Sequence, residues 1–82
     1  MKVVCMNDSN LPEGAVLSKW EEYDVESTYI NALDQKVYIL SNHINEGTTK
    51  FGMKWKGYRA DRFRQPEDIY AEEEKEFNYI LN

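Results

Sequence analysis

Short β-type segments, separated by runs of turn-forming residues, most constrain the fold of this 82-residue chain. Each segment is either rich in apolar and β-branched residues or alternates apolar with polar side chains, and both patterns are typical of strands. The predicted strands cover residues 2–6, 22–30, 36–40, 51–55 and 62–65. Because no helical periodicity separates them, the sequence predicts a mainly β domain over residues 1–65, a small five-stranded antiparallel barrel.

Two further segments complete the prediction for this domain. Residues 42–50 are polar and include Glu46 and Gly47, so we expect a loop there, and residues 59–61 could form one helical turn before the last strand. Closing the sheet into a barrel removes its exposed edges. A chain this short buries only a limited core, so its stability is expected to be modest.

Residues 66–82 differ from the β domain and predict an acidic C-terminal α-helix. Pro66 suits the first turn of a helix, and the acidic residues at 67 and 68 complement its positive end. Ile69, Phe77 and Ile80 fall on one face, which makes the helix amphipathic. Because a short helix is marginal in water, we expect it to dock on the barrel, on a partner, or on a second copy in a weak homodimer; otherwise the chain is a monomer.

Charge is divided into three blocks along the chain. Residues 1–49 and residues 66–82 each carry a net charge of −5, whereas residues 50–65 carry +5. The basic block and the acidic tail could neutralise each other within one molecule, or each could face a separate partner. The overall charge of −5 disfavours nucleic acid, but the basic block keeps nucleic acid open as an alternative partner.

Four stretches of the β domain carry a family resemblance: residues 2–8 (KVVCMND), 22–25 (EYDV), 37–40 (VYIL) and 58–63 (YRADRF). Together they resemble small uncharacterised phage and prophage proteins with an SH3-like β-barrel. The resemblance covers residues 2–65 and implies an SH3-like barrel and a phage or bacterial origin. It implies no activity, and it does not extend to the acidic tail.

Aromatic residues form the first candidate binding site. Trp20, Trp55 and Tyr58 could line a shallow groove of the kind that SH3-like barrels use to bind extended peptides. Tryptophan is enriched at binding hot spots, although a small barrel also needs large rings to fill its core. We expect Trp20, which precedes two glutamates, to be the exposed tryptophan.

Cations interleaved with aromatic rings form the second candidate site. Arg59, Arg62 and Arg64 lie close in sequence to Lys54, Lys56 and several aromatic residues. Nucleic-acid binders use cations for phosphates and rings for base stacking. The simpler interpretation is that the rings form the core and the charges are solvated. Alternation along the last strand then buries Phe63 and places Arg62 and Arg64 on the opposite face.

The acidic tail is the third candidate site, with Glu73 and Glu74 beside the apolar Phe77. It could cover the basic block of its own molecule. It could instead imitate a phosphate backbone and so occupy the nucleic-acid channel of a host defence enzyme. This interpretation makes the protein a phage inhibitor that acts through an acidic surface.

The sequence predicts no catalytic residue, metal site or cofactor. Cys5 is the only cysteine and lies in an apolar strand, so we expect a buried, inert thiol and a reducing, cytoplasmic setting. His43 has no second ligand at metal-binding spacing, and no apolar run is long enough to cross a membrane. We therefore expect a non-enzymatic, phage- or prophage-derived module that binds a protein. A nucleic-acid-binding accessory protein and the phage inhibitor are the alternatives.

Overall fold

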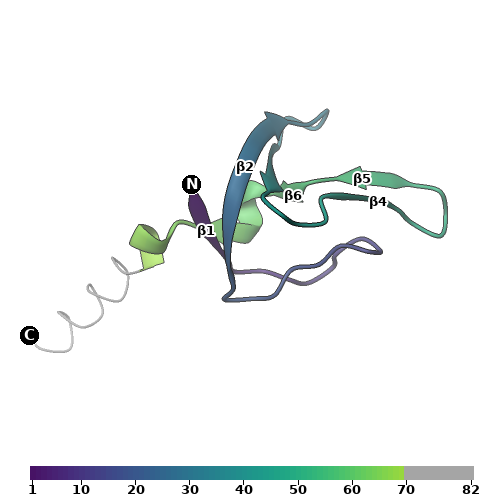
Figure 1. The fold of residues 1–82 in the computed structure, drawn as a ribbon. Helices are drawn as coiled ribbons and strands as arrows, with labels where there is room; N and C mark the ends of the chain where they lie inside the picture. Colours follow the sequence, from purple (N-terminus) through teal and green to yellow (C-terminus); the bar gives the residue numbers. More distant parts are fainter. Residues whose placement is uncertain (70–82) are drawn as a thin grey trace, which may run out of the picture.

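The computed structural model describes residues 1–69 of the chain. Its elements are β1 (Lys2–Cys5), β2 (Glu22–Ile30), β3 (Lys36–Leu40), β4 (Glu46–Thr48), β5 (Lys54–Lys56), β6 (Tyr58–Arg59), the 3-10 helix η1 (Ala60–Arg62) and β7 (Phe63–Arg64). Residues 66–69 are α-helical, at the point where the C-terminal helix was predicted to begin. The described chain is mainly β, as predicted (Figure 1). The predicted extent of the helix to residue 81 and its acidic face lie outside the described residues.

Five strands form one antiparallel sheet in the order β6-β3-β2-β1-β7. The first half of β2 pairs with β1 and its second half pairs with β3, with an irregularity between Val25 and Ser27. The edge strands β6 and β7 are separated in the chain only by η1. Edge strands of a flat five-stranded sheet would lie about 19 Å apart, whereas a three-residue 3-10 helix rises only about 6 Å. The sheet must therefore curl, although within residues 1–69 no pairing of β6 with β7 closes it into a barrel.

A second sheet contains β4 and β5, and here the prediction of strands was wrong in part. Residues 42–50 were expected to be a loop, yet β4 lies within them and pairs with β5. The strand expected at 51–55 begins only at Lys54. The alternation of Phe51, Met53 and Trp55 was misleading, because Phe51 and Met53 are exposed in the turn between the two strands.

The core lies on one face of the five-stranded sheet. Side chains two positions apart share a face of a strand, so Val3 and Cys5 of β1 are buried together, as are Tyr38 and Leu40 of β3. The buried cluster comprises Val3, Cys5, Leu17, Tyr38, Leu40, Tyr58 and Phe63. The burial of Cys5 and of Phe63 confirms two predictions from the strand pattern.

Gly57 allows the chain to cross the face of β3 that lies opposite the core. The φ angle of Gly57 is +71°, and a Cβ atom there would lie 2.5 Å from Val37 Cγ1 and 2.9 Å from the Tyr38 carbonyl oxygen. Only a residue without a side chain fits this close approach. The crossing connects β5 to β6 and contributes to the burial of Val37.

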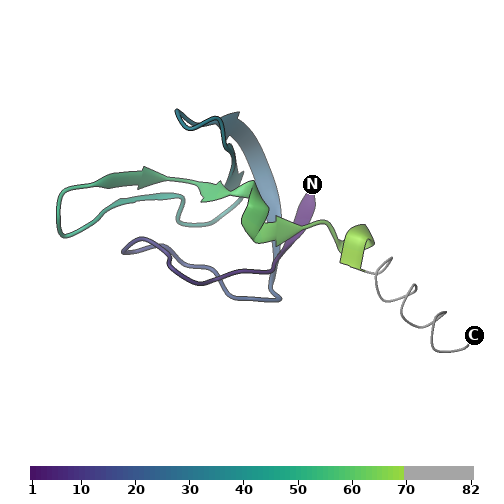
Figure 2. The same cartoon turned by 180° about the vertical axis from the view of Figure 1, so that it is seen from behind.

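Two long segments project from the same side of the curled sheet. One is the β4–β5 hairpin and the other is the loop of residues 6–21 between β1 and β2, which runs beside the hairpin in both views (Figures 1 and 2). The helical turn at residues 66–69 lies on the opposite side of the sheet (Figure 1). The hairpin and the loop are therefore the parts of the described chain that extend furthest from the core.

Candidate interaction surface

The turn of the β4–β5 hairpin has a fixed conformation. The Thr49 amide donates to the Met53 carbonyl at 2.8 Å, and the Gly52 amide donates to the Thr49 carbonyl at 2.9 Å. The Thr49 hydroxyl also accepts a hydrogen bond from the Met53 amide at 3.2 Å. Gly52 has a φ angle of +80°, a conformation that glycine adopts without strain. Hydrogen bonds and a suitable turn residue therefore hold the tip in one shape.

This tip exposes two large apolar side chains. Phe51 is 81% exposed and Met53 is 68% exposed, and the Lys50 ammonium lies 5.3 Å from the centre of the Phe51 ring. A single exposed apolar residue is common on proteins, but two neighbours on an ordered protruding turn form an apolar patch next to positive charge. We call residues 49–53 the hairpin tip.

The long loop supports the hairpin on one face through Glu13. The Trp55 indole N–H donates to the Glu13 carbonyl at 2.9 Å, and the Glu13 carboxylate accepts a hydrogen bond from the Lys50 amide at 2.8 Å. The Trp55 ring covers Gly47, where a Cβ atom would lie 2.6 Å from the indole nitrogen. Glu13 of the loop thus holds both Trp55, in the middle of β5, and Lys50, in the hairpin tip.

The base of the hairpin is joined to the same loop by Tyr58 and His43. The Tyr58 hydroxyl donates to the Ile44 carbonyl at 2.6 Å and accepts from the Val16 amide at 3.1 Å. The His43 Nε2–H donates to the Val16 carbonyl, and its ring contacts the Tyr58 ring edge-on. Burial raises the pKa of the Tyr58 hydroxyl, so it stays protonated at neutral pH. These bonds make the loop and hairpin one connected unit.

The other face of the hairpin carries two exposed lysines and one exposed glutamate. Lys54 and Lys56 are exposed there beside Glu46 and Thr48, and these four residues with Gly47 and Trp55 of the opposite face line a shallow depression at the hairpin. Lys56 also lies 6.0 Å from the centre of the Tyr29 ring. The hairpin therefore combines an apolar tip with two exposed cations on one face.

The predicted aromatic groove is not assembled from its three residues. Trp20 is 63% exposed, as expected, but no ring contact joins it to Trp55 or Tyr58 in the described part of the chain. Trp55 is half-buried with its N–H bonded internally, and Tyr58 is only 3% exposed. Tyr58 belongs to the core because it packs where β6 meets β3, and this pairing was not visible in the sequence.

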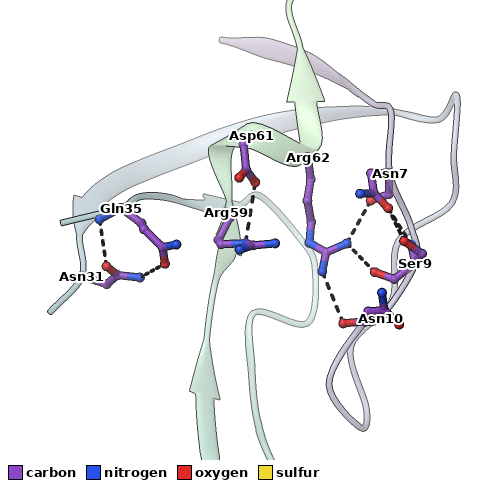
Figure 3. Close-up of polar contacts among 8 residues, drawn as sticks. All are labelled: Asn7, Ser9, Asn10, Asn31, Gln35, Arg59, Asp61 and Arg62. Atoms are coloured by element: carbon purple, nitrogen blue, oxygen red, sulfur yellow. Dashed lines mark hydrogen bonds and ion pairs between the residues drawn. The ribbon is translucent and has the colours of Figure 1, made fainter. Parts of the chain in front are cut away.

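Arg59 and Arg62 were predicted to act together, but the structure gives them different surroundings (Figure 3). Arg59 is exposed and forms an ion pair with Asp61 at 3.6 Å. Arg62 is buried, and its guanidinium donates to the Asn7, Ser9 and Asn10 carbonyls. The expectation that Arg62 faces solvent was wrong, because η1 turns its side chain under the long loop.

Three predicted site residues, Glu73, Glu74 and Phe77, lie outside the described residues. In contrast, the sequence pattern gave no indication of the hairpin tip, because the alternation of Phe51, Met53 and Trp55 predicted a strand. The signal that could have identified it was Gly52, which is typical of the left-handed position in a short hairpin turn.

Other functional groups are few in this part of the chain. Among residues 1–69, no group of three His, Cys, Asp or Glu side chains is arranged to hold a metal ion. Burial raises the pKa of the Cys5 thiol above its ordinary value. No helix of the described chain has the length and apolar character needed to cross a membrane. Comparisons with models of protein families, with curated proteins and with solved structures found no match to this chain.

Proposed function

We propose that this chain is a non-enzymatic binding module that holds a protein partner through its β4–β5 hairpin. The observation that carries this proposal is the pair of exposed apolar residues, Phe51 and Met53, on an ordered turn. Apolar side chains presented on a rigid protrusion lose little conformational entropy when they enter a pocket of a partner. Lys50 and Lys54 flank them, so the pocket belongs to an acidic protein surface.

The order of the strands supports an SH3-like barrel as the architecture of this module. In a small five-stranded barrel the sheet curls until its two edge strands approach each other. β1 pairs with β2 and β7, and η1 directly precedes β7. The phage or prophage origin rests on the sequence resemblance alone and stays a prediction.

A nucleic acid is the second candidate partner, and a specific observation favours it. Lys54 and Lys56 lie on one face of a two-stranded ribbon, an element of the size that enters the major groove of DNA. An aromatic residue at the tip could stack on a base. We place this below protein binding because the described chain also carries an acidic strand, with Glu22, Asp24 and Glu26 exposed on β2.

The inhibitor hypothesis depends on the acidic tail, and its residues lie outside the described part of the chain. An inhibitory role that acts through Glu73 and Glu74 therefore stays a prediction. Replacing these residues by glutamine would leave binding through the hairpin unchanged, so the two mechanisms are separable.

Affinity capture with matched variants tests the proposed function. The full chain is used as bait in a lysate of bacterial host cells, with and without nuclease. Phe51→Ser combined with Met53→Ser removes the apolar patch. The control is Leu33→Ser, because Leu33 is 76% exposed on the β2–β3 turn, which Asn31 fixes by accepting hydrogen bonds from the Leu33 and Gln35 amides.

We expect one protein to be recovered in a fixed ratio to the bait despite nuclease, to be lost with the double variant and to be retained with the control. Recovery that nuclease abolishes would instead establish the nucleic-acid function. A partner retained equally by all baits would show that the hairpin tip is not the binding site.

A further inference from the structure

The hydrogen-bond ladder of the β4–β5 hairpin can be assigned from its two ends. At the base, the Gly57 amide donates to the Asn45 carbonyl. At the tip, the Thr49 amide donates to the Met53 carbonyl at 2.8 Å. Hydrogen-bonded and non-hydrogen-bonded pairs alternate along an antiparallel ladder. The positions between these two ends follow from that alternation.

Gly47 and Trp55 are consequently the hydrogen-bonded pair in the middle of the hairpin. Lys54, opposite Thr48, and Lys56, opposite Glu46, are then non-hydrogen-bonded positions. The main-chain N–H and C=O groups of Lys54 and Lys56 therefore point away from β4. They form the outer edge of β5.

This outer edge has no strand beside it in the described chain. One of its four groups, the Lys56 carbonyl, accepts a hydrogen bond from the Tyr29 hydroxyl at 2.6 Å. The Lys54 N–H, the Lys54 carbonyl and the Lys56 N–H have no hydrogen-bond partner within residues 1–69. Unpaired groups along a strand edge are a template for pairing with another chain.

The side chains beside this edge define the charge of a strand that would fit. Side chains two positions apart project from the same face, so Lys54 and Lys56 lie together on one face of the hairpin. Trp55 projects from the opposite face, where its ring lies against Gly47 of β4, and the Tyr29 hydroxyl lies at the Lys56 end of the outer edge. An incoming strand would thus meet two ammonium groups on one face.

We propose that the outer edge of β5 receives an extended acidic segment of the partner protein as a third strand of the β4–β5 sheet. This inference rests on the proposed function and specifies the partner's chemistry. In an antiparallel addition, Lys54 exchanges two main-chain hydrogen bonds with one residue of the segment, and the Lys56 N–H donates to the residue two positions away. Directly opposed residues share a face, so both of those residues are acidic.

The recognised pattern is therefore two acidic residues separated by one residue of any type, in an extended conformation. The middle residue of the pattern faces the other side of the sheet and makes no main-chain bond to β5. The main chain supplies most of the binding, and the two lysines select the charge and the register, as in other cases of strand addition. The hairpin tip continues beyond the edge and is free to contact the rest of the partner.

Synthetic peptides test this inference with the full chain. The probe is an acetylated and amidated heptapeptide of sequence Thr-Val-Glu-Val-Glu-Val-Thr, titrated into ¹⁵N-labelled protein and followed by amide chemical shifts and hydrogen exchange. Two N-methylated peptides provide the main-chain test. Methylation of both glutamates removes the N–H groups that face β5, whereas methylation of the central valine alters an N–H that faces away.

We expect binding to shift and protect the Lys54 and Lys56 amides, and methylation of both glutamates to weaken binding at least tenfold relative to methylation of the central valine. Equal weakening by the two methylated peptides would show a charge-only interaction and overturn the inference. So would the absence of shifts at Lys54 and Lys56, or protection of these amides that rises with protein concentration without peptide, which would place a second copy at the edge.

Variants of the protein separate this inference from the proposed function. Lys54→Pro removes an N–H that points away from β4, so the hairpin ladder stays intact, and Lys54→Ala is its control because it retains the N–H. A second variant, Lys54→Glu with Lys56→Glu, should bind the matching lysine peptide Thr-Val-Lys-Val-Lys-Val-Thr and reject the glutamate peptide.

Peptide binding that Lys54→Ala and Lys54→Pro weaken equally would refute strand addition. Partner capture that depends on Phe51 but survives Lys54→Pro would leave the proposed function standing and reject only this inference. Loss of partner capture both with the Phe51→Ser and Met53→Ser double variant and with Lys54→Pro supports the proposed function and the inference together.

Discussion

Replacing Arg62 by methionine tests whether this side chain holds the long loop. Its guanidinium donates to the Ser9 carbonyl at 2.7 Å, to the Asn7 carbonyl at 3.1 Å and to the Asn10 carbonyl at 3.4 Å. Methionine keeps an unbranched apolar stem but removes every donor. The variant therefore isolates the hydrogen bonds from the packing of the stem.

The expected loss of stability follows from these three contacts. Hydrogen bonds to a charged group contribute about 1.5–3 kcal/mol each, so the two shorter bonds account for about 3–6 kcal/mol. Water can reach the freed carbonyls because they lie in an exposed loop, and the variant no longer buries a charge. We expect Arg62→Met to lower the free energy of unfolding by about 2–3 kcal/mol. In a domain of this size that corresponds to a fall in Tm of about 10–20 °C.

Arg59→Met is the matched control, because it removes the same charge three residues earlier. The ion pair of Arg59 with Asp61 is exposed, so its loss should change stability by no more than about 0.5 kcal/mol. Urea unfolding followed by tryptophan fluorescence measures both variants, and comparable m-values validate the comparison. Equal unfolding midpoints for the two variants would refute the role assigned to Arg62.

Three further measurements examine the supports of the hairpin and the core. Tyr58→Phe should lower the free energy of unfolding by about 1–3 kcal/mol because two internal hydrogen bonds are lost. Its control, Tyr29→Phe, loses one exposed hydrogen bond and should lower the free energy of unfolding by less than about 1 kcal/mol. Equal urea midpoints for the two variants would contradict this expectation. Gly47→Ala should displace the Trp55 ring and change the near-ultraviolet circular dichroism, and an unchanged spectrum would show that the ring does not cover this position. Burial raises the pKa of the Cys5 thiol above its ordinary value of 9.0. The stability gained by burying the neutral thiol is therefore complete below pH 9.0 and is lost as the pH rises toward the folded pKa. Cys5→Val should flatten the alkaline loss of stability, and a slope identical to that of the native protein would exclude Cys5 as its source.

The periodicity of the sequence was sufficient to predict most of the five-stranded sheet. β1, β2 and β3 lie where alternation and β-branched residues predict them, and η1 is within one residue of the predicted helical turn. These are local patterns, and burial of one face is enough to select them. β4 and β6 were missed because each is only two or three residues long and is stabilised by its pairing partner, not by its own composition.

Predictions of candidate binding residues were less successful, for a physical reason. Trp20 was correctly expected to be exposed, since its neighbours are charged. Arg62 was expected on a surface and Tyr58 either in the groove or in the core, yet both are buried, and each makes a contact with a residue more than 40 positions away in the chain. No local pattern contains such contacts, because they depend on how the long loop returns to the hairpin.

The sequence by itself determined the β class, the buried face of each long strand and the position of the basic block, because these follow from side-chain alternation and from charge. Only the tertiary structure decided which of those residues are available to a partner. The curl of the sheet and the docking of the loop on the hairpin bury Tyr58 and Arg62 and leave Phe51, Met53, Lys54 and Lys56 exposed. Exposure is set by contacts between segments distant in the chain, so it emerges only when the whole domain has folded.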